Sequence, residues 1–379
     1  MPNISRPLNS AASPEERQPL AHLAAIDGGL AFAALLLAAV GLATVHSASS
    51  ELAVDYLPRQ AVWVGIGLVL LLAAMSLDYR VLLDLSPTLY LGSLVLLGLV
   101  LVLGEVRGGA RSWFVLGPWQ FQPSELAKLA TTLFVARFLS EIDQPVLSLR
   151  QIATAVGIVA APMLLIVVEP DMGGAAMFVP LLAGMLLIAG VKLRYLVIAA
   201  ILATSVGFGL WTFGMQEYQR ERVITFLQPE RDPLGSGYHV RQSKIAVGSG
   251  QLVGKGYMQG TQSQLRFLPA RHTDFILAVL AEEWGFLGVA TVLGLYALYI
   301  RSGARIAMRA RDRSGILVVV GLLSVFCFHV LYNSAMVVGF LPITGIPLPF
   351  LSYGGTFMLY NFTATGIILG VDLRRYVNR

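Results

Sequence analysis

A carboxylate stands at the start of an apolar stretch near the middle of the chain, in LPARHTDFILAVLAEEWGF, residues 268–286. Thr273 is expected to cap a helix there, with Asp274 in its first turn. Asp274 would then lie near a membrane–water boundary, directly after the basic residues Arg271 and His272. At that place its carboxylate fits a general base, although an acid at a helix N-terminus also simply complements the helix dipole.

Further ionisable residues interrupt other apolar runs. QPSELAKLATTLF places Glu125 and Lys128 three residues apart on one face of a helix that begins near Pro123. An unpaired charge inside a membrane is costly, so the two are expected to pair, either to fix helix packing or to take part in catalysis. Glu282 and Glu283 follow about two turns into the helix after Asp274 and are assigned contacts with neighbouring helices.

A metal site is one interpretation of EPDMGG, which carries Glu169 and Asp171 at a helix boundary. Together with Asp274 they are candidate ligands for Mg²⁺ or Mn²⁺. Mg²⁺ often uses one or two carboxylates and completes its shell with water and phosphate oxygens. Complementation of a helix dipole is the alternative.

Two short segments outside the apolar runs fit the binding of an anion. GGARSWFVLGPWQF contains Arg111, which suits a phosphate, and Trp113; tryptophans near a membrane surface are also ordinary anchors. GIPLPFLSYGGTF leads into the last apolar run, where backbone N–H groups at a helix N-terminus form either an anion site or a simple cap. Its candidate binding residues are Ser352, Tyr353, Gly354 and Gly355.

The elements that must position these residues are membrane helices. The chain has 379 residues, of which 56% are hydrophobic and 13% are charged, against about 25% charged in soluble domains. Since one span needs about 20 apolar residues, we predict an all-α polytopic membrane protein. The expected spans, about ten in number, are 26–46, 60–77, 86–104, 122–140, 151–168, 174–190, 195–215, 274–300, 315–340 and 354–371.

The distribution of lysine and arginine predicts the orientation. The strongest basic cluster lies at 301–313, which favours a cytoplasmic position for that loop and for both termini. Residues 216–273 then form a long extracytoplasmic loop between the seventh and eighth helices. This loop is basic and contains Lys244 as well as Arg271, so it contacts either lipid headgroups or an anionic substrate.

Several function classes lack their motifs in this sequence. It contains no P-loop, no HExxH, no nucleophile elbow and no Cys/His metal pattern. An ATP-driven pump and a zinc-type membrane protease are therefore not expected, and no nucleic-acid partner is expected either. The single cysteine, Cys327, excludes an internal disulfide.

The sequence resembles the SEDS family (shape, elongation, division and sporulation proteins). The resemblance rests on QPSELAKLA, EPDMGG, PLPFLSYGGT and the long run FLQPERDPLGSGYHVRQSKIAVGSGQLVGKGYMQGTQSQLRFLPARHTDFILAVLAEEWGFLG, in the family's order. It covers about residues 25–372 as a single membrane domain, between a disordered cytoplasmic tail, 1–24, and a short tail, 373–379. GKGYMQGTQSQLRFLP is most similar to the branch that serves cell elongation.

The resemblance implies a peptidoglycan glycosyltransferase that polymerises lipid II at the outer face of the cytoplasmic inner membrane. It implies that Asp274 is the catalytic carboxylate, that Glu125 and Lys128 form the family's functionally important pair, and that Trp113 belongs to the site. Arg111 stands one position away from the arginine that the family often has before this tryptophan.

The resemblance also implies partners: lipid II, membrane lipids, the elongation machinery and a class B penicillin-binding protein with transpeptidase activity. Asp274 would deprotonate the acceptor hydroxyl in one inverting displacement, and Lys128, the basic loop and a divalent cation would stabilise the departing pyrophosphate. A lipid II flippase, and a scaffold that only recruits cell-wall enzymes, are the alternatives.

Overall fold

The computed structural model describes residues 27–377 apart from 51, 53, 108, 118, 196, 199–223, 225–227, 229–235 and 269. Its helices are α2 (Gly28–Ser49), α3 (Leu57–Ser76), α4 (Tyr79–Leu103), α5 (Pro123–Ser140), α6 (Leu149–Val168), α7 (Met172–Ala176), α8 (Phe178–Ala189), α11 (Ser236–Ser249), α12 (Thr261–Gln264), α13 (Ile276–Arg309), α14 (Arg313–Val337) and α15 (Gly355–Val377). Its strands are β1 (Glu105–Arg107), β2 (Ala110–Leu116) and β3 (Trp119–Phe121).

The predicted all-α polytopic membrane class is confirmed as a mostly helical multi-pass fold, with a small sheet as the departure. Within the described residues, 8 helical segments are long and apolar enough to cross a membrane, with α7 and α8 forming one of them. The expected span 122–140 is also a helix, α5, but Glu125, Lys128 and Arg137 make it more polar than the others. The expected span 195–215 falls largely outside the described residues.

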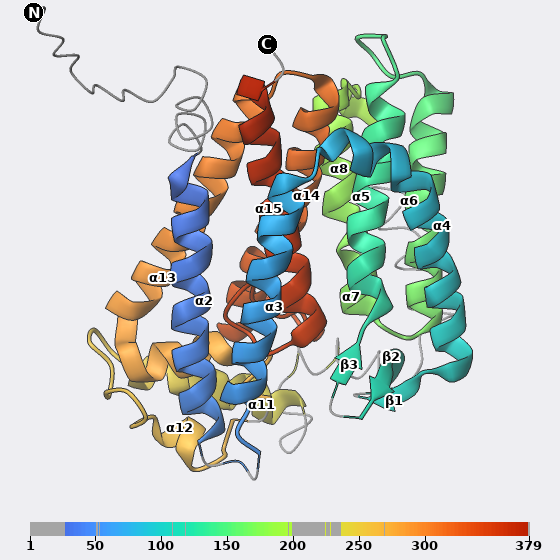
Figure 1. Cartoon of the computed structure of the whole chain (residues 1–379). Coiled ribbons are helices and arrows are strands. Elements are labelled where there is room, and N and C mark those ends of the chain that lie inside the picture. The colour runs from blue at the N-terminus through green and yellow to red at the C-terminus, as the bar shows by residue number, and fades with distance from the viewer. Residues whose placement is uncertain are drawn as a thin grey trace, which may run out of the picture.

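The helices stand side by side as a bundle with two distinct ends (Figure 1). At one end, here the termini end, α2 begins and α15 finishes, and the Asp27 N–H donates to Asp372 at 2.8 Å. At the other, the loop end, lie the three strands, α11, α12 and the beginnings of α5, α13 and α15 (Figure 1). The residues predicted to do chemistry therefore gather at one end of the bundle.

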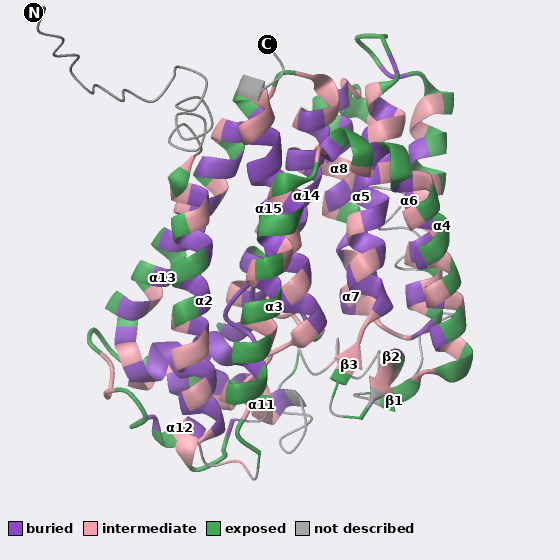
Figure 2. Cartoon of the chain, viewed as in Figure 1, coloured by how far each residue is buried: buried purple, intermediate pink, exposed green. Residues whose placement is uncertain are grey.

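Burial separates a central layer from a peripheral one. In the most apolar window of α15, 83% of the residues are buried, whereas the corresponding window of α3 has 22% buried. Figure 2 shows this contrast along α3, α4 and α15. α15 packs along α3, α4 along α5, and α2 along α13. The exposed apolar side chains of the peripheral helices are those expected to face lipid.

The segment between α4 and α5 differs from the prediction, because it folds into a small antiparallel sheet of order β1-β2-β3. Glu105 pairs with Trp113, and Phe114 with Phe121. Two further boundaries also differ. α13 starts at Ile276, after Asp274, and α15 continues through the predicted C-terminal tail as far as Val377.

A break in α13 shapes the loop end. Gly285 has φ +66°, outside the helical region, and a Cβ there would lie 2.3 Å from the Gly254 nitrogen. N–H groups just after the break bond to carbonyls of the residues before Gly254 instead of to their own helix. Phe286 N–H donates to the Gln251 carbonyl at 2.8 Å, and Leu287 N–H donates to the Leu252 carbonyl at 3.1 Å. The loop after α11 is thereby built into the kinked helix.

Replacing this glycine is expected to loosen the loop end. Gly285→Ala would combine a strained positive φ with a backbone clash, at a cost of about 1–3 kcal/mol or more. Thermal unfolding in detergent should therefore show a clear decrease in Tm. Gly294→Ala, at an α13 position where a Cβ meets nothing within 4 Å, is the matched control. Equal Tm values for the two variants would contradict this account of the break.

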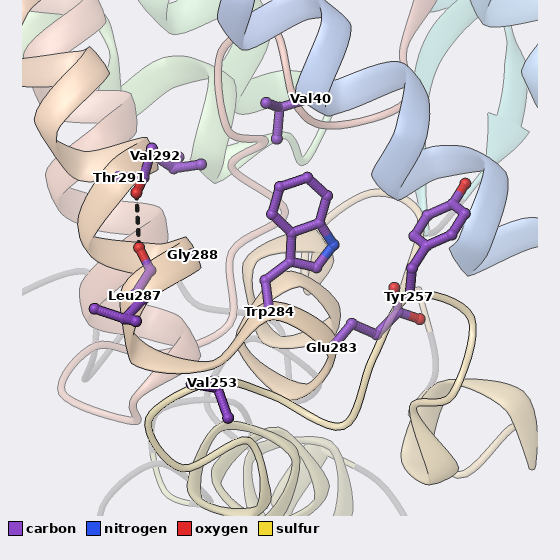
Figure 3. Close-up of a pocket in the computed structure, with 9 residues that line it drawn as sticks. All are labelled: Val40, Val253, Tyr257, Glu283, Trp284, Leu287, Gly288, Thr291 and Val292. Atoms are coloured by element: carbon purple, nitrogen blue, oxygen red, sulfur yellow. Dashed lines mark hydrogen bonds between the residues drawn. The ribbon is translucent and has the colours of Figure 1, made fainter.

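A pocket of about 380 Å³ opens beside the break. Figure 3 shows Trp284 between Val40 of α2 and Val253 of the loop. Leu287 and Val292 lie to one side of Trp284, and Tyr257 lies to the other. The Glu283 carboxylate at its edge accepts a hydrogen bond from the Ser47 hydroxyl of α2. This contact between α2 and α13 is the structural role that the sequence predicts for Glu283.

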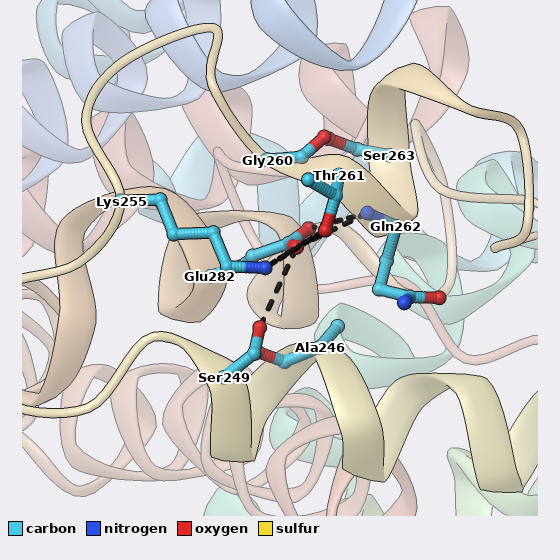
Figure 4. A network of polar contacts seen from close by, with 8 residues as sticks. All are labelled: Ala246, Ser249, Lys255, Gly260, Thr261, Gln262, Ser263 and Glu282. Carbon is cyan, nitrogen blue, oxygen red and sulfur yellow. Dashed lines mark hydrogen bonds and ion pairs between the residues drawn. The ribbon is translucent and has the colours of Figure 1, made fainter.

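Glu282 anchors the same loop through a network of polar contacts (Figure 4). Its carboxylate has no exposed surface and accepts from Lys255 Nζ at 2.6 Å, Thr261 Oγ1 at 3.1 Å and Gln262 N–H at 3.1 Å. The prediction that Glu282 contacts neighbouring helices therefore holds for α12, and Lys255 of the loop is a partner that the sequence did not indicate.

Loss of this anchor is expected to be strongly destabilising. Glu282→Ala removes the buried carboxylate that accepts from Lys255, Thr261 and Gln262, and hydrogen bonds to a charged group contribute about 1.5–3 kcal/mol each. Tm in detergent should fall well below that of Glu141→Ala, which breaks the exposed Arg137–Glu141 pair. A similar loss from both variants would argue against the anchor.

Candidate functional site

Asp274 lies in a turn before α13, and this corrects the prediction that it belongs to the first helical turn. Phe275 is the N-cap of α13 and makes no side-chain cap bond. The Thr273 hydroxyl does not cap the helix but donates to the Ala270 carbonyl at 3.2 Å. The Asp274 side chain is half-buried, so it is accessible from the loop end without being fully hydrated.

The turn is held from outside by a non-helical segment, residues 338–354, that joins α14 to α15. Tyr353 N–H donates to the His272 carbonyl at 2.8 Å. The Ser352 hydroxyl donates to the Thr273 carbonyl at 2.7 Å. Asn333, on α14, donates to the Asp274 carbonyl at 2.9 Å. Three consecutive carbonyls of the turn therefore each accept a bond from α14 or from the segment that follows it.

An aromatic cluster covers the turn. The His272 ring stacks on Tyr56 with centroids 4.6 Å apart, and Tyr353 lies 4.5 Å from Tyr56. Burial, assisted by the neighbouring Arg271 charge, lowers the pKa of His272 to about 4. His272 is therefore neutral near pH 7, which favours packing over the binding of an anion by charge.

This shift predicts a pH dependence of stability. The unfolded chain binds the His272 proton near pH 6.5, whereas the folded chain binds it only near pH 4. The stability associated with neutral His272 is complete above about pH 6.5 and is lost as the pH falls toward 4. His272→Phe, which retains a ring against Tyr56, should therefore lose less Tm than the wild type between about pH 7 and about pH 5. An identical decrease in both proteins would exclude His272 as the source.

The predicted basic contacts are not gathered at one point. Arg271 is buried and donates from Nε to the Ala48 carbonyl of α2 at 2.7 Å. Arg111 is exposed on β2 and donates to the Leu101 carbonyl at 3.4 Å. The Lys244 side chain lies over Gly339. Trp113 is half-buried on β2. Substrate contacts by these four residues stay predictions.

Glu125 and Lys128 form the predicted ion pair in the first turns of α5. Lys128 Nζ lies 2.9 Å from Glu125 Oε1, and both side chains are buried. His329 of α14 donates from Nδ1 to the Pro347 carbonyl at 2.9 Å, which leaves its Nε2 lone pair toward Lys128 Nζ at 3.5 Å. The ammonium also lies 4.8 Å from the Tyr360 ring centroid. Lys128 is thus enclosed by side chains of α5, α14 and α15 inside the bundle.

The carboxylates of EPDMGG lie beside this pair. Gln122, just before α5, donates from Nε2 to Asp171 at 3.1 Å, and Asp171 also caps α7 through Gly174 N–H at 2.8 Å. Glu169 is fully buried, and its pKa is raised to about 8 by burial and by the charge of Asp171, with Ser112 acting in the opposite direction.

These residues do not make a complete metal site. Among the residues that the structure describes, no group of three or more His, Cys, Asp or Glu side chains could hold an ion. Asp171 already accepts two hydrogen bonds, and burial disfavours the charged form of Glu169 and raises its pKa. The protein groups alone therefore do not fit a resident Mg²⁺ or Mn²⁺.

The start of α15 is less open than the predicted anion site requires. Tyr353 N–H is bonded to His272, and Gly354 N–H donates to Gln60 Oε1 at 3.4 Å. Gly355 is needed for packing, since a Cβ there would lie 2.2 Å from the Trp63 ring. An anion contact by the remaining N–H groups stays a prediction. The predicted contact by Ser352 is not supported, because its hydroxyl is buried and bonded to Leu348 and Thr273.

Sequence reasoning missed the polar residues that connect these parts. Asn333 and His329 are buried, four residues apart on one face of α14, and both bind carbonyls of the segment 338–354. Gln60 of α3 is also buried and donates to the Ser352 carbonyl at 3.2 Å. Each is an isolated polar residue within an apolar helical run of the sequence, and that feature could have identified it as a candidate.

Comparison with known proteins gives consistent matches over nearly the whole chain. Residues 29–376 match the FtsW/RodA/SpoVE family model, described as cell cycle protein. Peptidoglycan glycosyltransferase MrdB of Escherichia coli K12 is 41% identical over 333 residues, covering 87% of this chain and 89% of that protein. Peptidoglycan glycosyltransferase RodA of Treponema pallidum is 33% identical over 417 residues, covering 90% and 96%.

Solved structures agree. A chain of a peptidoglycan synthase complex that coordinates polymerization and crosslinking superposes with a TM-score of 0.81 at 35% identity, covering 93% of this chain and 99% of that chain. The rod shape determining protein RodA of Thermus thermophilus gives a TM-score of 0.70 at 32% identity, covering 93% and 98%.

Proposed function

Because the chain belongs to the FtsW/RodA/SpoVE (SEDS) family and is a peptidoglycan glycosyltransferase of the RodA type, we propose that it polymerises lipid II into glycan strands with Asp274 as general base. The observation that carries this assignment is the position of Asp274. Its carboxylate is half-buried in a turn at the loop end, outside any helix, and the backbone of that turn is fixed by α14 and the segment 338–354.

In the proposed reaction, Asp274 accepts the proton of the 4-hydroxyl of the acceptor sugar. The oxygen attacks the anomeric carbon of the donor, and the bond from that carbon to the pyrophosphate breaks in the same displacement. The anomeric configuration inverts. Pyrophosphate leaves as an anion, so the site needs positive charge at the leaving group instead of an acid.

Lys128 is the buried cation best suited to stabilise that charge from within the bundle. Its ammonium is held by Glu125 and approached by His329, which limits its movement. A fixed charge in a site of low dielectric constant stabilises a developing anion more strongly than a hydrated one. A divalent cation that arrives with the substrate's pyrophosphate remains part of the proposal, although no step above depends on it.

The location follows from the same proposal. The loop end would face the extracytoplasmic side of the cytoplasmic membrane, with both termini in the cytoplasm, because the basic cluster at 301–313 lies at the termini end. The partner we propose is a class B penicillin-binding protein, supported by the similarity to a chain of a peptidoglycan synthase complex.

A flippase is the second candidate, since buried charges at Glu125 and Lys128 would also suit a carrier of a lipid-linked anion. The two functions differ in their product. Proteoliposomes that contain the wild-type protein, its partner and fluorescent lipid II should form polymer that a muramidase degrades. Transfer of lipid II between leaflets with no polymer would favour the carrier.

A further inference from the structure

We infer that Asn333 and Ser352 are positioning residues for the proposed glycosyl transfer, and that they fix the turn that presents the Asp274 carboxylate. The inference rests on the proposed function and adds to it two residues that do not touch the reacting atoms. Neither side chain has exposed surface. Both must therefore act through the residues they bind.

Asn333 joins two pieces of backbone with one rigid amide. Its Nδ2 donates to the Asp274 carbonyl at 2.9 Å and to the Ile346 carbonyl at 2.8 Å. These two bonds use both protons of the amide nitrogen. The distance between the turn and the segment 338–354 is thereby set by a single group on α14.

Ser352 performs the same task one residue earlier in the turn. Its hydroxyl accepts from Leu348 N–H at 2.8 Å and donates to the Thr273 carbonyl at 2.7 Å. Adjacent carbonyls of the turn are thus bound by two side chains from different elements. Rotation of either peptide that flanks Asp274 would break one of these bonds, and unsatisfied buried polar groups are costly.

The turn contains a strained residue. Ala270 adopts φ +47°, a left-handed conformation that is unfavourable for a residue with a Cβ. Bonds inside the turn converge on the Ala270 carbonyl, which accepts from Thr273 N–H at 3.1 Å, the Thr273 hydroxyl at 3.2 Å and Phe275 N–H at 3.3 Å. Without the outside bonds, this strained turn is expected to relax and to displace the Asp274 side chain.

A displacement of about 1 Å at a reacting group costs about 10²-fold in rate. Asn333→Ala and Ser352→Ala should therefore each lower kcat by about 10- to 100-fold. KM for lipid II should stay within about twofold, because uniform binding of the substrate is retained. Since both side chains act on one turn, the losses should combine non-additively in the double variant.

The test measures polymerisation kinetics of the full chain with its partner in proteoliposomes, alongside Tm in detergent. Ser324→Ala is the control for Asn333, because Ser324 also lies on α14 but bonds only to the Val320 carbonyl of its own helix. Thr363→Ala is the control on α15, where Thr363 bonds to Leu359. If Asn333→Ala does not fold, the nearly isosteric Asn333→Asp replaces it. Ser352→Thr keeps a hydroxyl and should therefore recover part of the kcat that Ser352→Ala loses.

The inference is supported if kcat falls selectively in the Asn333 and Ser352 variants while both controls stay near wild type at similar Tm. It is overturned if these variants keep the wild-type kcat, or if only KM rises. Asp274→Ala, assayed in parallel, separates the two claims. An inactive Asp274→Ala beside fully active Asn333 and Ser352 variants removes this inference alone, whereas an active Asp274→Ala removes the proposed base.

Discussion

Asp274→Asn is expected to lower the rate of glycan polymerisation by about 10²–10⁴-fold, the usual contribution of a general base. The variant keeps the size of the side chain and one acceptor oxygen, but it cannot take up the proton of the acceptor hydroxyl. The hydrogen bonds to the main-chain carbonyls of the turn come from Tyr353, Ser352 and Asn333, and the substitution does not affect them. Folding and lipid II binding should therefore be retained.

The measurement compares kcat and KM for purified lipid II, with Tm in detergent as the check on folding. Asp55→Asn is a suitable control, since Asp55 is an exposed acid before α3 that accepts from Leu57 N–H at 2.9 Å. A normal kcat for Asp274→Asn would contradict the role of base. A scaffold that only recruits other enzymes predicts that normal result.

Lys128→Met is expected to reduce both stability and activity. The substitution leaves the Glu125 carboxylate buried without its partner at 2.9 Å, and breaking such a pair costs about 3–5 kcal/mol. It also removes the cation proposed to stabilise the leaving pyrophosphate. Tm and kcat should decrease together.

The double variant Glu125→Gln, Lys128→Met separates the two contributions. Replacing a buried ion pair with neutral groups of similar volume is often neutral or stabilising, so Tm should recover. The rate should stay low, because the positive charge is still absent. Recovery of both Tm and the rate would show that the pair only fixes helix packing, the other interpretation that the sequence leaves open.

The parts of this site that sequence could predict are local ones. Pairing of Glu125 with Lys128 follows from a spacing of three residues and from the cost of a bare charge in a membrane. The structural role of Glu282 follows from its depth in an apolar run. Helix spans follow from composition: 8 of the expected spans coincide with helices long and apolar enough to cross a membrane. The expected span 122–140 is the more polar helix α5, and 195–215 lies largely outside the described residues.

The parts that sequence missed depend on contacts between distant segments. Asn333 and His329 lie in an apolar run, and their partners are carbonyls of a segment without regular structure, which no periodicity encodes. The break at Gly285 lies inside a continuous helical pattern and becomes necessary only because the loop at Gly254 passes against it. The small sheet is also too short to leave a clear alternating pattern.

Whether the chain polymerises lipid II with Asp274 as its base can be tested in proteoliposomes. Purified lipid II is incubated with the wild-type chain or with Asp274→Ala, each with and without the penicillin-binding partner. We expect glycan polymer from the wild type, alone or with the partner, and none from Asp274→Ala inserted into the membrane at the same level. Equal polymer from both proteins, or no polymer from the wild type under either condition, would contradict it.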